Sequence, residues 1–546
     1  MDLAYLILIV LAVIYVPIWV WVWRKPEQAE RYHLCKYGPC IMIKTRLGFK
    51  TMDRLCKYTR FWRAFGFFSK LVSAVLFLLM MYMLVVAIIA VPSRMASGSS
   101  IGIEYALAIP GLNPMLPLVY GVIALVVAMV VHELGHGIQA RANGARVDSS
   151  GLLYGVVPLG AFVEPNEEDM KKKSRRAQMD MYTAGISVNT VVAILCFALL
   201  VGCCGTLSSD YEDDAGVYYM DDGSPAYLAG IPASAIITGV SESSVYDPSD
   251  PSTIQSVGTS VVDGSVSLDA DVDPLHYYYV QYVYNDETYV TEEPIQMGVY
   301  VRSLTSGGPA DQAGIENGEF IYSIVIGDDE HTVGSISEFR QVMDATSPGQ
   351  TVEVGIVQAV AYGSGDASVQ AVAYGSGDAS VQYVTVTLGD NGGRSLLGVT
   401  MSTSGMTFTT PGILLDRAMN PFYGADSAYS YFTSIFSYLS GPFNGMDPIS
   451  DEVQWWYDAP MGDVMWFIIT LLYWLFWLNI LLAISNALPA YPFDGGFIFA
   501  GGVSWLCEKL GVRDEERRNR ITESVSGSVS TVVLFMFMIV VLSFLM

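Results

Sequence analysis

The chain has 546 residues, of which 52% are apolar and only 15% are charged, and its mean hydropathy is +0.39. A soluble surface normally needs about a quarter charged residues, so this composition excludes a wholly soluble protein and predicts a membrane protein with a soluble part. The net charge of −25 excludes a nucleic-acid-binding protein, because a phosphate backbone requires basic partners.

Six apolar runs are each long enough to cross roughly 30 Å of hydrocarbon. They are Leu3–Trp23, Leu71–Val91, Leu116–Ala140, Met181–Gly202, Val464–Ala490 and Val525–Met546. The first run is too long for a signal peptide and lacks a basic leading segment and a small-residue cleavage site, so we expect a retained helix. The sequence therefore predicts a polytopic α-helical membrane protein with about six transmembrane helices.

Charge is distributed unevenly along the chain. Residues 205–463 contain 36 of the 54 acidic residues, four of the 29 basic residues and none of the seven cysteines. Residues 24–70 contain twelve Lys or Arg residues, and the segments 141–180 and 509–520 are also basic. By the positive-inside rule the three basic loops lie in the cytosol, so both termini and the acidic segment lie outside it. We expect a multi-pass protein of the cell membrane.

The third apolar run carries the sequence His132-Glu133-Leu-Gly-His136. Residues i and i+4 share one face of a helix, so both imidazoles can bind one Zn²⁺. Glu133 then lies beside a water whose pKa the zinc lowers to about 7, and it can act as the general base. Charged groups within a membrane are costly, which favours a catalytic role over a packing role.

The acidic segment contains a repeat. The pattern G-x-P-A-x-x-A-G-I begins at Gly223 and again at Gly307. After the second copy, Ser337–Met343 has helical spacing and Thr351–Val357 alternates as a strand does. This segment resembles two bacterial-type PDZ domains, of α/β or mostly-β structure, which bind peptides by strand addition. A twelve-residue tandem duplication, at 358–369 and 370–381, predicts a longer hairpin in the second copy and no chemistry.

A third zinc ligand is expected after the fifth apolar run, in Asn486-Ala-Leu-Pro489-Ala-Tyr-Pro492-Phe-Asp494-Gly-Gly. The prolines break the helix, and an irregular backbone at that depth is tolerated only inside protein or beside a wet cavity. Counted along the helices, Asp494 lies at a depth similar to that of His132 and His136, near the cytosolic side of the bilayer.

Together the two motifs and the PDZ-like insertion between them resemble the site-2 protease family of intramembrane zinc metalloproteases, of archaeal or bacterial type. The resemblance implies that His132, His136 and Asp494 bind Zn²⁺, that Glu133 is the catalytic base, and that no other cofactor is bound. It also implies regulated cleavage of peptide bonds in or near the transmembrane helices of single-span substrate proteins, with an upstream protease as a possible partner.

The same resemblance extends to the segments around the metal helix. Tyr154–Val163 is similar to the family's membrane-associated β-hairpin. Gly185-Ile-Ser-Val-Asn189 stands where the family has G-P-x-x-N, without the proline, which implies that Asn189 positions the substrate or the developing oxyanion. Asn486 could serve similarly.

The expected organisation has six segments, namely 1–115 (N-terminal helices and basic loop), 116–204 (first part of the protease core), 205–295 and 296–400 (PDZ-like domains), 401–463 (extracytosolic linker with an amphipathic segment) and 464–546 (second part of the core). Three alternatives stay open at this stage. They are a membrane metalloprotease with a glutamate third ligand, Glu508 or Glu523, an inactive PDZ-bearing scaffold, and a metal transporter.

Overall fold

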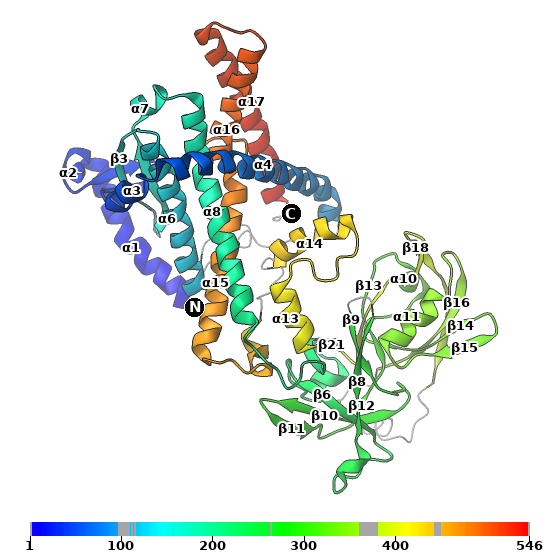
Figure 1. The fold of residues 1–546 in the computed structure, drawn as a ribbon. Helices are drawn as coiled ribbons and strands as arrows, with labels where there is room; N and C mark the ends of the chain where they lie inside the picture. Colours follow the sequence, from blue (N-terminus) through cyan, green and yellow to red (C-terminus); the bar gives the residue numbers. More distant parts are fainter. Residues whose placement is uncertain are drawn as a thin grey trace. The chain divides into compact units, whose positions relative to one another are not determined.

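The computed structural model describes residues 3–96, 110, 113, 116–156, 158–262, 265–359, 380–441 and 449–543. The chain forms two compact units. The membrane unit comprises Met1–Cys203, Leu439–Met446 and Phe467–Met546, and the β-rich unit comprises Cys204–Tyr438 and Asp447–Trp466. Figure 1 shows the helices of the first and the strands of the second. A membrane protein with an additional β domain is thereby confirmed.

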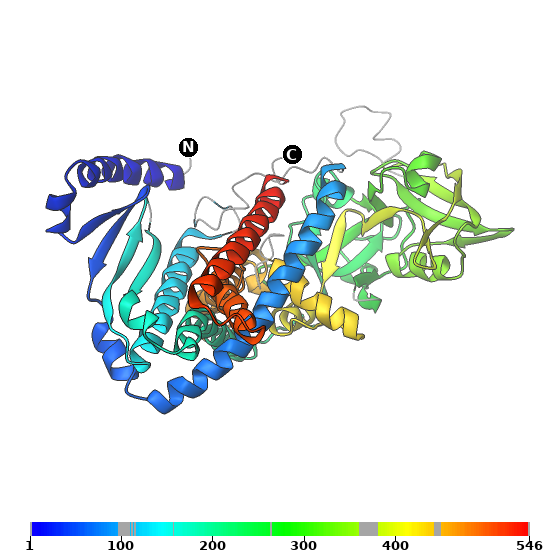
Figure 2. The same cartoon turned by 90° about the horizontal axis from the view of Figure 1, so that it is seen from above.

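Five helices of the described residues are long and apolar enough to cross a membrane. They are α4 (Thr59–Ala96), α6 (Leu118–Ala142), α8 (Arg175–Cys204), α15 (Asp463–Asn486) and α17 (Glu515–Leu542). The first apolar run forms α1 (Leu3–Arg24), of which Val10–Arg24 counts only as a shorter apolar helix. The expected number of six spans therefore stays a prediction. Figure 2 shows α17 beside α4.

A four-stranded antiparallel sheet lies at one side of these helices (Figure 2). Its strands, in order, are β1 (Leu34–Tyr37), β2 (Cys40–Thr45), β3 (Val147–Tyr154) and β4 (Pro158–Pro165). The expected hairpin at 154–163 is present as β3 and β4, but its first strand begins seven residues earlier, at Val147. The sequence did not predict that β2 of the N-terminal loop pairs with β3. This pairing leaves β4 as an edge strand of the sheet.

The remaining helices of the membrane unit are short or follow the break after α15. They are α2 (Pro26–Glu30), α3 (Phe49–Leu55), α7 (Glu167–Lys171) and α16 (Asp494–Lys509). The helix ends at Asn486 and restarts at Asp494, so the predicted interruption is confirmed. The prolines in between cannot donate the backbone hydrogen bonds that would continue a helix.

The β-rich unit contains two modules, each with its own apolar core. The first contains β5 (Ala215–Met220), α9 (Pro225–Leu228), β6 (Ile236–Glu242), β7 (Gln255–Ser256), β8 (Gly258–Val262), β9 (Ser265–Asp269), β10 (Tyr277–Tyr284), β11 (Glu287–Val290) and β12 (Ile295–Gln296). The second contains β13 (Val299–Leu304), α10 (Pro309–Ala313), β14 (Phe320–Ile326), β15 (Asp329–Thr332), α11 (Ile336–Asp344), β16 (Thr351–Val357), β17 (Gln382–Thr387), β18 (Gly389–Asn391), β19 (Arg394–Leu396) and β20 (Val399–Thr403). The helix and strand predicted at 337–343 and 351–357 are α11 and β16.

The repeated sequence has the same local structure in both modules. Pro225 and Pro309 each begin a short helix, α9 and α10, because the fixed φ of proline suits a first helical turn. Gly230 and Gly314 follow these helices with φ of 77° and 87°, a conformation that glycine adopts without strain. The repeat in the sequence is therefore a repeat in structure.

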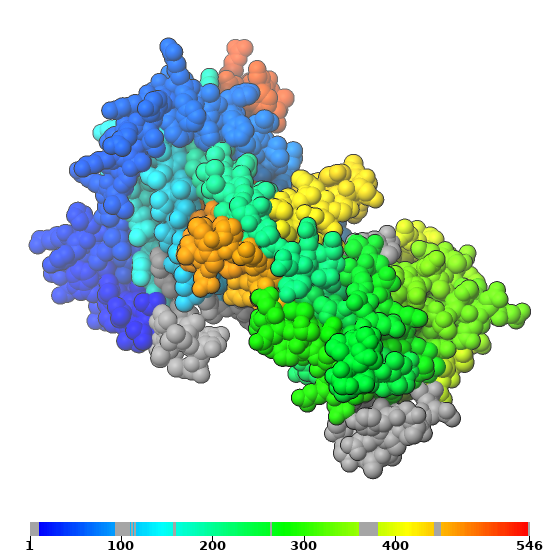
Figure 3. Space-filling view, turned by 60° about the horizontal axis from the view of Figure 1, so that its bottom comes forward, coloured from blue at the N-terminus to red at the C-terminus, as the bar shows by residue number. Residues whose placement is uncertain are grey.

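One strand outside the repeat joins the two modules. β21 (Met406–Thr409) follows the second module in the chain but pairs with β5, and Met406 and Phe408 lie in the first core. The segment expected as a linker thus completes the first module, and it continues into α13 (Pro411–Met419) and α14 (Ala428–Ser440). In Figure 3 the first module is green and the second yellow-green, and the two are in contact. The twelve-residue duplication lies largely in 360–379, outside the described residues.

Candidate metal centre

Helix α6 presents two histidines on one face. His132 and His136 are both buried, with 6% and 8% of their surface exposed, and their Nε2 atoms are 3.2 Å apart. Asp494 Oδ2 lies 3.2 Å from Nε2 of His132 and 3.1 Å from Nε2 of His136. The structure thus brings together three side chains whose ligand atoms all lie within 4.8 Å of one another.

A tight turn between α15 and α16 carries Asp494 to the histidines. A Cβ added to Gly495 would meet the backbone carbonyls of Ala487 and Leu488, so the turn requires a residue without a side chain there. The turn is also held from the last helix, because Tyr491 N–H donates a hydrogen bond of 2.9 Å to Ser530 Oγ of α17. Asp494 is therefore fixed at the first position of α16 rather than in an exposed loop.

The donor set fits a metal ion. His136 Nδ1 lies 2.8 Å from the carbonyl oxygen of Met181, which accepts its proton and leaves Nε2 as the atom with a free lone pair. Oδ2 of Asp494 is buried and faces the Nε2 atoms of both histidines. Two imidazole nitrogens and one carboxylate oxygen are the ligand set of a catalytic site that keeps a fourth position open.

Space for such an ion is preserved by Gly185 of α8. A Cβ at this position would lie 2.7 Å from Cε1 and 2.8 Å from Nε2 of His132, and closer still to Nε2 of His136. Any side chain at 185 would therefore occupy space directly beside Nε2 of both histidines. The sequence indicated Gly185 only as the start of the motif that ends at Asn189, and its contact with the histidines was not predicted.

The carboxylate of Glu133 lies on the same helix, between the two histidines in sequence. Its Oε2 accepts a hydrogen bond of 2.8 Å from the backbone N–H of Val163 in β4. Val163 is paired with Ser150 of β3, yet its N–H points away from β3 and toward α6. Among the described strands β4 is the last of this sheet, and its outer edge therefore faces the metal helix.

The two asparagines lie outside the group of three ligands. Asn189 is fully buried in α8, and neither atom of its amide has a hydrogen-bond partner among the described residues. It follows Gly185 by four residues and so shares the helix face that touches the histidines. Asn486 is half-buried and donates to the carbonyl of Leu482 one turn earlier, at 3.0 Å. Their roles in substrate positioning stay predictions.

The alternative ligand Glu508 has another partner. It is an exposed residue near the end of α16, and its carboxylate lies 2.7 Å from Nη1 of Arg175. That hydrogen-bonded pair lowers the pKa of Glu508. Within the described part of the chain, neither Glu508 nor Glu523 belongs to a group of side chains that could hold a metal, whereas Asp494 does.

Comparison with known proteins assigns the chain to a family. The sequence model of peptidase family M50 matches residues 120–541, a segment that contains both halves of the metal centre. The chain belongs to peptidase family M50, the site-2 protease family. A member of this family is a membrane metalloprotease, and the predicted resemblance is confirmed.

The chain is also similar to an archaeal protein. The uncharacterized protein MJ0971 of Methanocaldococcus jannaschii is 31% identical over 203 residues. These residues are 37% of this chain and 52% of the relative, so the chain spans about half the length of the curated relative that it matches. The match with family M50 begins at residue 120, after α1–α4, so the N-terminal helices and strands lie outside it.

Proposed function

We propose that this chain is an intramembrane zinc metalloprotease that hydrolyses peptide bonds in or near the transmembrane helices of single-span membrane proteins. The observation that carries the proposal is the group of His132, His136 and Asp494, with Glu133 beside it. The two histidines lie on a helix apolar enough to cross a membrane. An ionisable side chain within a membrane costs roughly 2.5–3.5 kcal/mol, so such residues are retained where they act.

Each residue of the centre has a distinct task. His132, His136 and Asp494 hold the ion, and Met181 fixes the tautomer of His136 through its carbonyl. Bound zinc supplies Lewis acidity, which lowers the pKa of water and polarises a carbonyl. Glu133 accepts the proton of the attacking water and later delivers it to the leaving amine.

The edge of β4 supports a way to present the substrate. A transmembrane helix satisfies its amides internally, so it must unwind before its carbonyls can react. Strand addition to β4 would receive the unwound segment at the edge whose Val163 N–H already contacts Glu133. Asn189, buried and with no hydrogen-bond partner among the described residues, would hold the substrate or the developing oxyanion. Asn486 would first have to release the carbonyl of Leu482.

The two modules of the β-rich unit are proposed to be PDZ-like domains outside the cytosol that select substrates. A cavity of about 390 Å³ is lined in part by Ile336 and Arg340 of α11 and by 399–402 of β20. A helix facing a strand edge is the arrangement that binds a peptide by strand addition. In this proposal the modules admit proteins already trimmed by an upstream protease. We also propose that the chain crosses the membrane six times and that the metal centre lies near the cytosolic side of the bilayer.

The decisive experiment combines zinc content with cleavage of single-span substrates reconstituted in vesicles. Glu133→Gln keeps the shape of the side chain and removes the base, so we expect stoichiometric zinc and a rate lower by at least about 100-fold. Asp494→Ala should lose the metal, whereas Glu508→Gln, the matched control, should keep both metal and activity.

Three outcomes would refute the proposal. Full cleavage by the Glu133→Gln variant would show that this carboxylate is not the base. No cleavage by the parent protein, and the same behaviour in Glu133→Gln, would favour an inactive scaffold or a transporter. Metal retained in Asp494→Ala and lost in Glu508→Gln would instead identify the metalloprotease with a glutamate ligand.

A further inference from the structure

Helix α8 contacts both halves of the metal centre with its first three turns. Toward α6, it supplies the carbonyl of Met181 to His136 and places Gly185 against both imidazole rings. Close packing continues one turn further, where a Cβ on Gly135 of α6 would lie 3.0 Å from a methyl group of Val188. A displacement of α8 along its axis would therefore move two contacts of the histidines together. These are the Met181 carbonyl, which accepts from His136, and Gly185, which packs against both rings.

The same part of α8 also holds α16, the helix that begins with Asp494. The rings of Tyr182 and Phe497 stack with centroids 5.0 Å apart and planes 7° apart. A Cβ on Gly501 would lie 2.5 Å from the sulfur of Met179, which indicates a close approach of the two helices. Residues 175–185 of α8 are thus the element against which both the histidine helix and the aspartate helix are placed.

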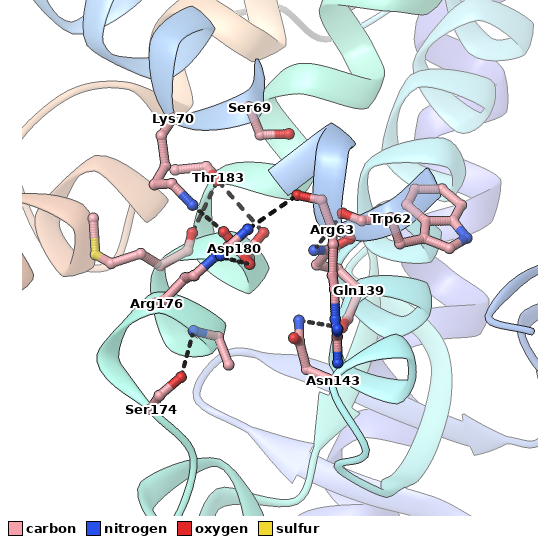
Figure 4. A network of polar contacts seen from close by, with 12 residues as sticks. Trp62, Arg63, Ser69, Lys70, Gln139, Asn143, Ser174, Arg176, Asp180 and Thr183 are labelled. Carbon is pink, nitrogen blue, oxygen red and sulfur yellow. Dashed lines mark hydrogen bonds and ion pairs between the residues drawn. The ribbon is translucent and has the colours of Figure 1, made fainter. Parts of the chain in front are cut away.

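The third face of α8 is fixed by an ion pair with α4 in which the carboxylate is buried. Asp180 is 1% exposed, and its Oδ1 is paired with Nζ of Lys70. Figure 4 shows Asp180 between Lys70 and Arg176, whose Nε lies 3.8 Å from Oδ2. The helices approach closely here, because a Cβ on Gly66 would lie 2.6 Å from Cγ of Asp180. Two turns later, Ser187 Oγ donates to the carbonyl of Ser69 at 3.3 Å.

We infer that Asp180 and Lys70 are positioning residues of the metal centre. Through this pair, α4, which lies outside the segment matched to family M50, sets the position of α8 against His132, His136 and Asp494. A buried carboxylate that loses its cation must be hydrated or move, and either change separates α8 from α4. The inference rests on the proposed function only in taking the three ligands as a zinc site.

The first test changes the spacing of α4 and α8 and leaves every charge in place. Gly66→Ala inserts a methyl group into the contact with Asp180, and we expect the dissociation constant for zinc to rise about tenfold. The visible absorption of the Co²⁺-substituted protein should change in the same variant, because it reports ligand geometry. Gly202→Ala is the matched control, since a Cβ at this position of α8 would meet no atom of the described residues within 4 Å.

The second test changes the charges. Asp180→Asn and Lys70→Met should each weaken zinc binding by about 10–100-fold, as loss of an outer-shell partner does. The double variant should bind zinc more tightly than either single variant, because it buries no unpaired charge. If a single variant does not accumulate, the double variant and Gly66→Ala still report on the pair.

The outcomes separate this inference from the proposed function. Zinc affinity and Co²⁺ spectra unchanged in Gly66→Ala, or unchanged in the single charge variants, would overturn the positioning role while leaving the protease intact. A parent protein that binds no zinc would overturn the metal centre itself.

Discussion

Glycine has different roles in the metal centre and in the β-rich unit. In the metal centre it allows a close approach between helices, and in the β-rich unit it allows a backbone conformation. Gly185 lies between helices, where it keeps a volume empty beside the two histidines. Gly314, by contrast, ends a short helix with φ of 87°, and a Cβ at this position would meet no atom within 4 Å in the part of the chain that the structure describes. Substitution at the first position therefore changes a distance at the metal ligands, whereas substitution at the second strains a turn.

Gly185→Ala tests the role of glycine at the metal centre and has the largest expected effect. We expect zinc affinity to fall by at least about 100-fold, because the added Cβ occupies the space in which the ligand atoms of both histidines converge. The measurement is zinc content after dialysis against a weak chelator, together with cleavage of a single-span substrate. Gly202→Ala in the same helix, where the space is open, should match the parent in both. Stoichiometric zinc in Gly185→Ala would show that the histidines do not bind a metal through these Nε2 atoms.

The second prediction concerns the edge strand of the small sheet. Proline at position 163 removes the N–H that donates to Glu133, and since that N–H does not bond to β3 the sheet should persist. We expect Val163→Pro to lower the rate of cleavage by about 100-fold while zinc content is unchanged. Val163→Ala keeps the N–H and is the control.

A rate in Val163→Pro equal to that of Val163→Ala would contradict a role of this edge in catalysis. A loss of zinc in Val163→Pro alone would instead indicate that β4 supports the metal ligands.

The sequence predicted those features of the site that depend only on residues close together in the chain. His132 and His136 share a face because they are four residues apart, and the break before Asp494 follows from two prolines. Their meeting was predicted through the resemblance to a family. The contact of Gly185 with the histidines and the ion pair of Asp180 with Lys70 could not be predicted in this way, because each depends on how distant helices pack.

The same reasoning explains the fold of the β-rich unit. The repeat predicted two modules, since both copies carry the same glycine and proline turn residues and the second copy is followed by helical spacing and strand alternation. The sequence did not predict that β21 lies between β20 of the second module and β5 of the first, because a four-residue strand has no sequence pattern that identifies its partner. The pairing of β2 with β3 was missed for the same reason.

The smallest expected effect on the metal centre follows from removing the modules altogether. Thr409 pairs with Gly216 across neighbouring strands, so a cut that removes 217–408 leaves ends about 5 Å apart, which a short Gly-Ser linker closes. We expect zinc content and the cleavage of pre-trimmed substrates to stay within about twofold of the parent, because none of the ligands is removed.

Cleavage of untrimmed substrates by this variant should rise by about tenfold, if the modules exclude them in the parent. Removing only 300–402 is the matched comparison, since Val299 pairs with Thr403 and the first module keeps β21. An increase in both variants would assign the selection to the second module, whose α11 and β20 line part of the cavity. An increase only after the larger removal would assign the selection to the first module. Unchanged exclusion of untrimmed substrates in both variants would refute a filtering role, because the larger removal deletes the modules that are proposed to exclude those substrates.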